Sequence, residues 1–181
     1  MNIDNILQQA EKLGFYTAQA IPPETLKLNP EVRKMCMSNK CHQYDLCWTC
    51  PPACGTLEEM EHRIRSFNSG ILLQSIGDIE DSFDFEAMEE LEKQHQKRFA
   101  DLVAWIQTEV KDILPLSAGC CRICPTCTYP DAPCRFPELA FVSLEGAGIL
   151  VSELCADNDV PYYYGAHRLA YTAALLINSD A

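Results

Sequence analysis

The sequence contains no long run of apolar residues and no basic segment that leads into one. A membrane-spanning helix needs about 18 or more consecutive apolar residues, so none is expected in this chain. Residues 1–15 are mostly polar and lack the apolar core of an export signal. We therefore expect a cytoplasmic protein that does not enter a membrane.

Basic residues are also scarce in this sequence. It has 14 Lys and Arg against 26 Asp and Glu, which gives a formal net charge of −12. A chain of this charge repels the phosphates of nucleic acids and anionic lipid surfaces. Nucleic acid is therefore not expected as a partner, whereas the acidic surface would suit a basic redox partner protein.

Cysteine is the residue that the sequence has in excess. Apolar residues (48%) and charged residues (22%) occur as in ordinary globular proteins, and 181 residues predict a single domain over 1–181. The 11 cysteines, by contrast, are far above ordinary usage. In a reducing cytoplasm, clustered cysteines bind metal or perform redox chemistry more often than they form disulfides or serve as scattered buried thiols.

Apolar periodicity predicts an α+β fold, in which a largely antiparallel sheet is covered by helices and two cysteine-rich metal-binding loops interrupt the pattern. The loops are expected at 36–55 and 119–137, where apolar periodicity is absent. The last two strands are expected to form a hairpin through Gly165. Helices are expected at 3–13, 30–36, 57–67, 84–114 and 143–155, and strands at 15–21, 70–76, 160–164 and 169–177.

The second loop carries Cys121, Cys124 and Cys127 at consecutive x2 intervals, with Cys134 further along. Three thiols at this spacing followed by a distant fourth are typical of ferredoxin-type iron–sulfur sites. Zinc would also accept four thiolates, usually from two separated Cys-x2-Cys pairs. Such pairs exist as Cys47/Cys50 with either Cys121/Cys124 or Cys124/Cys127, but the triplet spacing favours iron and sulfide.

The first loop is less regular, because it offers five thiols to a site that takes four. Spacing alone does not identify the spare thiol. A histidine beside thiols is usually a hydrogen-bonding neighbour, so His42 is a weaker ligand candidate. The five thiols are Cys36, Cys41, Cys47, Cys50 and Cys54.

Several motifs around these loops resemble a family of bacterial and archaeal proteins catalogued as predicted metal-binding proteins of unknown function. The resemblance runs from about Val32 to the C-terminus. It implies a metal or iron–sulfur site built from both loops, without a settled activity. The motifs are Tyr44, Trp48, Cys50-Pro51-Pro52, Cys121-x2-Cys124-x2-Cys127, Pro133-Cys134-Arg135-x-Pro137 and Ser143-Leu144-Glu145-x-x-Gly148-Ile149.

The resemblance also implies a set of ligands. This chain departs from the family pattern by adding Cys47 and Cys54, by placing Cys120 beside Cys121, and by a looser gap after Cys36. We assign Cys54 to the first site on proximity, with Cys47 as the runner-up. The positions that match the family are Cys36, Cys41, Cys50, Cys121, Cys124, Cys127 and Cys134.

Other residues have both a functional and an ordinary interpretation. Arg122 and Arg135 could stabilise a reduced cluster or could be surface arginines, and Trp48 could shield a cluster or fill the core. Cys155 and His95 lie on apolar helical faces, which favours buried structural roles for both.

The leading hypothesis is an iron–sulfur protein with two 4Fe-4S clusters that transfers electrons or serves as a redox module for a partner enzyme. The alternative is a structural zinc protein or adaptor, in which metal binding contributes folding energy. A third hypothesis is an enzyme in which one cluster has an open iron that binds substrate.

Overall fold

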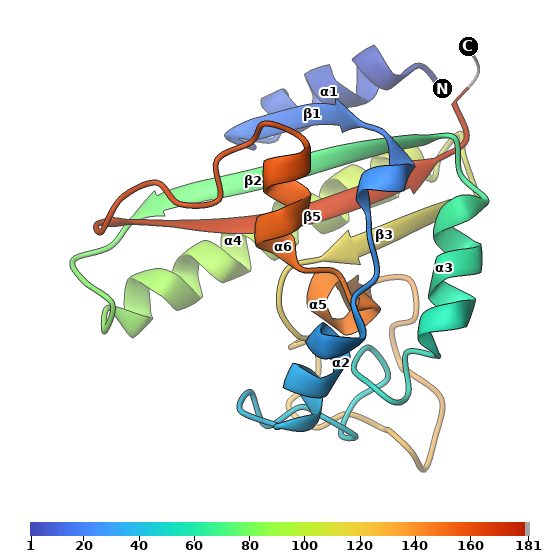
Figure 1. Ribbon diagram of the computed structural model, residues 1–181, viewed down its shortest axis with the longest axis vertical. Coiled ribbons are helices and arrows are strands. Elements are labelled where there is room, and N and C mark those ends of the chain that lie inside the picture. The colour runs from blue at the N-terminus through green and yellow to red at the C-terminus, as the bar shows by residue number, and fades with distance from the viewer. Residues whose placement is uncertain (180–181) are drawn as a thin grey trace.

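A five-stranded sheet forms the centre of the computed structural model, which describes residues 1–179 (Figure 1). The strand order is β1-β2-β5-β3-β4, and each neighbouring pair is antiparallel except β3 and β4. The predicted α+β class with a largely antiparallel sheet is therefore confirmed. The strands are β1 (Thr17–Ile21), β2 (Ser69–Asp78), β3 (Ile113–Ser117), β4 (Val142–Ser143) and β5 (Arg168–Ile177).

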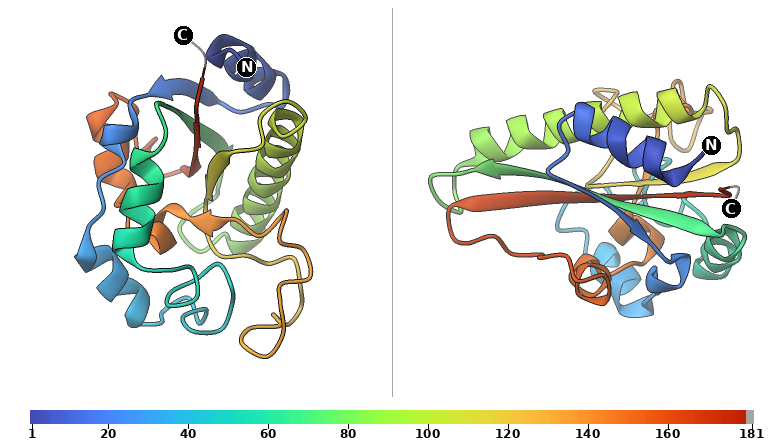
Figure 2. Two further views of the ribbon diagram at one scale, coloured as in Figure 1. Left: turned by 90° about the vertical axis from the view of Figure 1, so that its right-hand side faces the viewer. Right: turned by 90° about the horizontal axis from the view of Figure 1, so that it is seen from above.

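Helices cover both faces of this sheet (Figure 2). The helices α1 and α4 pack on one face, and α3, α5 and α6 lie on the other together with α2. None of the helices within residues 1–179 is both long enough and apolar enough to cross a bilayer. The helices are α1 (Ile3–Lys12), α2 (Pro30–Met37), α3 (Leu57–Arg65), α4 (Phe85–Ile106), α5 (Leu144–Ala147) and α6 (Val151–Asp157), with a 3-10 turn η1 (Pro23–Thr25).

The inner strand β2 is buried on both of its faces. Ile71 and Leu73 pack into the core under α1 and α4, whereas Leu72 packs into the core under α3, α5 and α6. All three side chains are fully buried. This explains why the sequence of β2 is a continuous apolar run rather than an alternation of apolar and polar residues.

Helix caps start the two helices that flank the first cysteine loop. The Asn29 side chain accepts a hydrogen bond from the Glu31 backbone N–H and so starts α2, which carries Cys36 in its last turn. At the other end, Thr56 and Glu59 form a capping box that starts α3. These local signals set where α2 begins and where the loop enters α3.

The predicted helix over 84–114 is wrong at its C-terminal end, because α4 stops at Ile106 and residues 113–117 form β3. Pro115 lies within β3 rather than ending a helix. Ile113 pairs with Ile177 of β5 and is buried in the core under α4. Its apolar side chain would continue the helical spacing equally well, so pairing with a distant strand decides the conformation.

The predicted hairpin over 160–164 and 169–177 is also wrong. β5 forms as expected, but residues 160–164 form no strand, and the neighbours of β5 are β2 and β3. Tyr162 and Tyr163 are exposed. The Tyr164 hydroxyl donates to Gln74 Oε1 at 2.7 Å. This aromatic segment therefore contacts β2 through a side-chain hydrogen bond rather than through the backbone hydrogen bonds of a strand.

The helix expected from Ser143 to Cys155 is divided into α5 and α6. Ser143 caps α5 as expected, with its hydroxyl accepting from the Gly146 N–H at 2.9 Å. Gly148 then adopts a φ of +98° and ends the helix. His95 and Cys155 are fully buried, as expected for structural residues.

Gly148→Ala is expected to lower the free energy of unfolding by about 1–3 kcal/mol, because an L-residue is strained at this φ. A Cβ atom at this position would also clash with Leu57 Cδ2. Gly165→Ala is a matched control, because Gly165 has a φ of +102° and nothing within 4 Å of an added Cβ. Urea unfolding should therefore place Gly148→Ala below Gly165→Ala, and equal midpoints would contradict the crowding at Leu57.

Candidate metal centre

The two cysteine loops lie side by side at one end of the molecule, at the bottom of Figure 1 and of the left view of Figure 2. The first loop spans residues 38–56 and the second loop spans residues 118–141, and neither contains a helix or strand. The second loop leaves β3 and returns as β4, where Leu116 and Ser117 pair in parallel with Val142 and Ser143. Its two ends are therefore anchored next to each other in the sheet.

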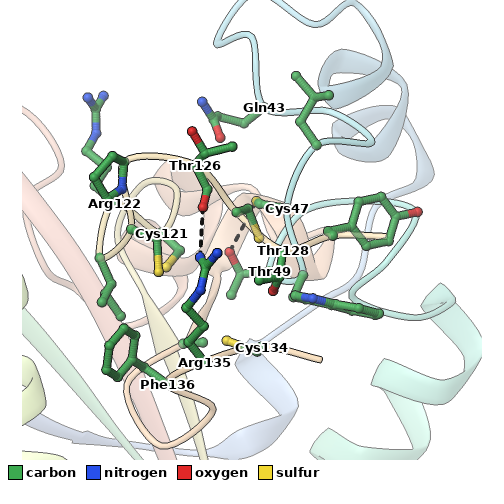
Figure 3. A pocket seen from close by; sticks show the side chains of 18 of the residues that line it. Gln43, Cys47, Thr49, Cys121, Arg122, Thr126, Thr128, Cys134, Arg135 and Phe136 are labelled. Atoms are coloured by element: carbon green, nitrogen blue, oxygen red, sulfur yellow. Dashed lines mark hydrogen bonds between the residues drawn. The ribbon is translucent and has the colours of Figure 1, made fainter. Parts of the chain in front are cut away.

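The loops enclose a cavity of about 650 Å³ (Figure 3). All four thiols predicted for the second site line it, and Cys47 of the first loop lines it as well. The structure thus brings these five thiols to one cavity, although they are separated by up to 87 residues in the sequence (134 − 47). The four from the second loop are Cys121, Cys124, Cys127 and Cys134.

The thiols surround this cavity without meeting at one point. Within residues 1–179, no three His, Cys, Asp or Glu side chains are grouped so that they could hold a single metal ion. All cysteines are free thiols rather than disulfides in this part of the chain. The donor set fits a thiolate-bound metal group, because soft sulfur ligands select zinc, copper and iron–sulfur clusters.

Trp48 and Tyr129 connect the two loops. The Trp48 indole N–H donates to the Ala132 carbonyl oxygen at 3.1 Å, and its ring meets the Tyr129 ring edge-to-face with centroids 4.9 Å apart. The Tyr129 hydroxyl donates in turn to Asp45 Oδ1 at 2.9 Å. Trp48 therefore forms part of the cavity wall between the loops and lies outside both core clusters.

Cys47 is the thiol most disposed to ionise. A hydrogen bond from the Cys50 thiol lowers the pKa of Cys47 to about 6, with a further contribution from Thr49, whose hydroxyl lies 3.6 Å from Cys47 Sγ. The same hydrogen bond, together with burial, raises the pKa of Cys50. Because the thiolate is the form that binds metal, the lowered pKa agrees with Cys47 as the alternative to Cys54 in the first site.

Two of the four thiols assigned to the first site lie against α5. The Cys36 thiol donates to the Glu145 carbonyl oxygen at 3.8 Å, and the Cys54 thiol donates to the Gly146 carbonyl oxygen at 3.5 Å. Cys41 is exposed. Burial raises the pKa of Cys36, and the Cys50 pKa is raised by its hydrogen bond to Cys47 and by burial; Cys41 adds a smaller electrostatic contribution in the same direction to both. Of the thiols assigned to the first site, Cys36 and Cys54 therefore lie against α5, and Cys50 lies beside Cys47.

The two arginines of the second loop also line the cavity. Arg122 is exposed and pairs with Glu92 at 3.5 Å, a contact that raises the pKa of Arg122. Arg135 donates to the Thr126 carbonyl oxygen at 3.0 Å and so fastens the end of the loop to its middle (Figure 3). Both arginines therefore place positive charge beside the thiols, and Arg135 also has a structural role.

A family model described as a predicted metal-binding protein, DUF2284, matches residues 19–177. The chain belongs to the DUF2284 family. The resemblance inferred from the cysteine motifs is therefore confirmed. No curated protein and no solved structure matches the chain.

The DUF2284 match extends over the whole sheet except its first two residues and over both cysteine loops. Every cysteine of this DUF2284 protein lies within the matched region, whereas α1 lies outside it. The metal-binding description of the family thus applies to the part of the chain in which the thiols gather.

Sequence reasoning missed one residue of this DUF2284 protein, Arg33. It lies on α2, one helical turn before Cys36, and that spacing is the signal that could have identified it. Arg33 Nη1 donates to the Gly55 carbonyl oxygen at 3.0 Å, directly after Cys54. His42, the weaker ligand candidate, is exposed and adopts a left-handed φ of 55°.

Proposed function

We propose that this protein holds two 4Fe-4S clusters and passes electrons as a redox module for a partner enzyme. Cys121, Cys124, Cys127 and Cys134 would hold the cluster of the second loop. The cluster of the first loop would be held by Cys36, Cys41, Cys50 and Cys54.

The observation that carries this proposal is the cavity of about 650 Å³ lined by five thiols. A water molecule takes about 30 Å³, so the cavity has room for a group of several atoms rather than a single ion. The x2 spacing of Cys121, Cys124 and Cys127 suits ligation of several irons in one cluster. Together they favour a cluster over the structural zinc ion considered from the sequence.

The residues of this chain would bind and tune the clusters, which supply the one-electron chemistry when they are present. Arg122 and Arg135 place positive charge at the cavity and would favour the more anionic, reduced state. Trp48 would exclude water from the side on which the loops meet. The positive charges would raise the reduction potential, whereas the exclusion of water would lower it, because a drier site disfavours the more anionic reduced state.

The two sets of ligand cysteines meet at Cys47, which forms a hydrogen bond with Cys50 of the first set and lines the cavity of the second set. Electrons could therefore pass between two clusters held by these sets. This arrangement supports electron transfer, because a module with adjacent cofactors connects a donor on one side to an acceptor on the other.

The acidic N-terminal half of α4 would receive a basic redox partner. Glu89 lines both the thiol cavity and an adjoining hollow that Glu86 and Glu90 share. A basic surface docked there would lie next to the second cluster site. Charge complementarity of this kind speeds association more than it strengthens binding, so the association rate should fall as salt rises.

Anaerobic purification tests the proposal directly. We expect a brown protein with broad absorbance near ~400 nm and about eight iron and eight acid-labile sulfide atoms per chain. Colourless protein that contains zinc and no sulfide would contradict the proposal and support the zinc alternative. Electron paramagnetic resonance of the reduced protein would then show whether both clusters accept an electron.

A further inference from the structure

Arg33 carries two buried donors that have no partner among the described residues. Its Nε and Nη2 atoms are inaccessible to solvent and make no hydrogen bond, while Nη1 donates to the Gly55 carbonyl oxygen. The ion pairs formed within residues 1–179 do not include Arg33 either. Buried N–H donors without an acceptor are unfavourable, because they have lost water and gained no hydrogen bond in return.

The surroundings of Arg33 indicate what would satisfy these donors. Burial raises the pKa of the Cys36 and Cys54 thiols, and the positive charge of Arg33 lowers both. Geometry also places Arg33 near both thiols, because it lies one helical turn before Cys36 on α2 and its Nη1 donates to the carbonyl oxygen of Gly55, directly after Cys54. An anionic acceptor between these thiols would pair with the guanidinium group.

Both thiols also contact the backbone of α5. The carbonyl oxygens of Glu145 and Gly146 already accept from the Cys36 and Cys54 thiols. The sulfur atoms of a metal-bound thiolate or of an iron–sulfur cluster accept hydrogen bonds, and Arg33 has two free N–H donors for such acceptors.

We propose that Arg33 Nε and Nη2 donate hydrogen bonds to the sulfur atoms of the metal group held by Cys36 and Cys54, and that Arg33 thereby raises its reduction potential. This inference rests on the proposed function, because it requires a redox-active group in the first site. Arg33 acts on the ligands and is a positioning residue for the cluster. Reduction by one electron makes the cluster more anionic, so a cationic donor stabilises the reduced state.

Replacing Arg33 separates the contributions of its charge and of its donors. Arg33→Lys keeps the charge but loses the planar pair of Nε and Nη2 donors, whereas Arg33→Gln loses the charge as well. We expect one of the two reduction couples to move to lower potential in both variants. In Arg33→Gln the affinity of this couple for an electron should fall about tenfold, which corresponds to 59 mV for a one-electron couple.

The experiment is a redox titration of anaerobically purified protein, reduced with a low-potential chemical reductant and followed by electron paramagnetic resonance. Arg63→Gln is the matched control, because Arg63 also donates to a backbone carbonyl, that of Ile113, but has Asp112 and Phe67 rather than thiols as its other partners. Its two couples should keep the wild-type potentials. Iron and sulfide are counted in every sample, so that potentials are compared at equal cluster content.

Two results would overturn the inference, and they differ from each other. Unchanged potentials in cluster-loaded Arg33→Lys and Arg33→Gln would overturn the role of Arg33 and leave the proposed function standing. Wild-type protein without iron and sulfide would overturn the proposed function and the role of Arg33 with it. Arg33→Lys keeps the test decisive if the loss of charge in Arg33→Gln prevents folding.

Discussion

Cys124→Ser is expected to lower the iron and acid-labile sulfide content of the anaerobically purified protein by about half. Cys124 is the middle thiol of the x2 triplet and lines the cavity of the second site. A serine hydroxyl is a harder donor than a thiolate and stays protonated near neutral pH, so it does not replace the ligand. The first site draws its ligands from another loop and should keep its cluster.

Cys155→Ser is the control for this variant. Cys155 is fully buried on α6, where its sulfur accepts a hydrogen bond from Gln74 Nε2 at 3.7 Å, and it lies in neither cysteine loop. Its removal should leave the iron and sulfide per folded chain unchanged. Unchanged iron in Cys124→Ser would contradict our assignment of the second site. Loss of all iron in Cys124→Ser would contradict the independence of the two sites.

The parts of the fold that the sequence predicted are those set by local signals. Asn29 before Pro30, Ser143 before Leu144 and Gly14 after α1 start or end helices through contacts within a few residues. Such contacts are present in the sequence pattern itself. The beginnings of α2 and α5 were therefore predicted to the residue.

The errors arose where distant segments decide the structure. Residues 113–117 have apolar spacing that suits a helix, yet they pair with β5 more than 50 residues away. Residues 160–164 are aromatic enough for a strand, yet both neighbouring positions of β5 are taken by β2 and β3. The local pattern does not show which segments pair as strands, because strands are joined by backbone hydrogen bonds that form with many combinations of side chains.

The same distinction applies to the candidate site, where local spacing predicted some residues and contacts between distant segments place the others. The spacing of Cys121, Cys124 and Cys127 identified thiols that line one cavity, because close spacing guarantees proximity. The position of Cys47 on that cavity depends on contacts between the loops through Trp48, which spacing does not encode. Arg33 was missed for a related reason, since only the structure leaves two of its donors buried without a partner.

Phe99→Ala is expected to lower the free energy of unfolding by about 3–5 kcal/mol, the usual cost of removing a large aromatic side chain from a core. Phe99 lies on α4, is fully buried, and belongs to the core cluster between α1, α4 and the sheet. Its ring also meets the Phe141 ring edge-to-face at 5.4 Å. Phe141 is the last residue of the second cysteine loop, so this core residue also anchors the chain that returns from the candidate metal site. Urea unfolding under anaerobic conditions, followed by circular dichroism, measures the change.

Phe85→Ala on the same helix is the matched control for Phe99→Ala. The Phe85 side chain is 69% exposed, so its removal leaves no cavity and should change the free energy of unfolding by less than about 0.5 kcal/mol. If Phe141 holds the second loop through Phe99, iron should also pass to an added chelator faster from Phe99→Ala than from Phe85→Ala under native conditions. Equal stability of the two variants would contradict the packing of Phe99 in the core between α4 and the sheet. A large loss of stability with an unchanged rate of iron release would instead mean that the loop is held by its contacts with Trp48 and Arg135 alone.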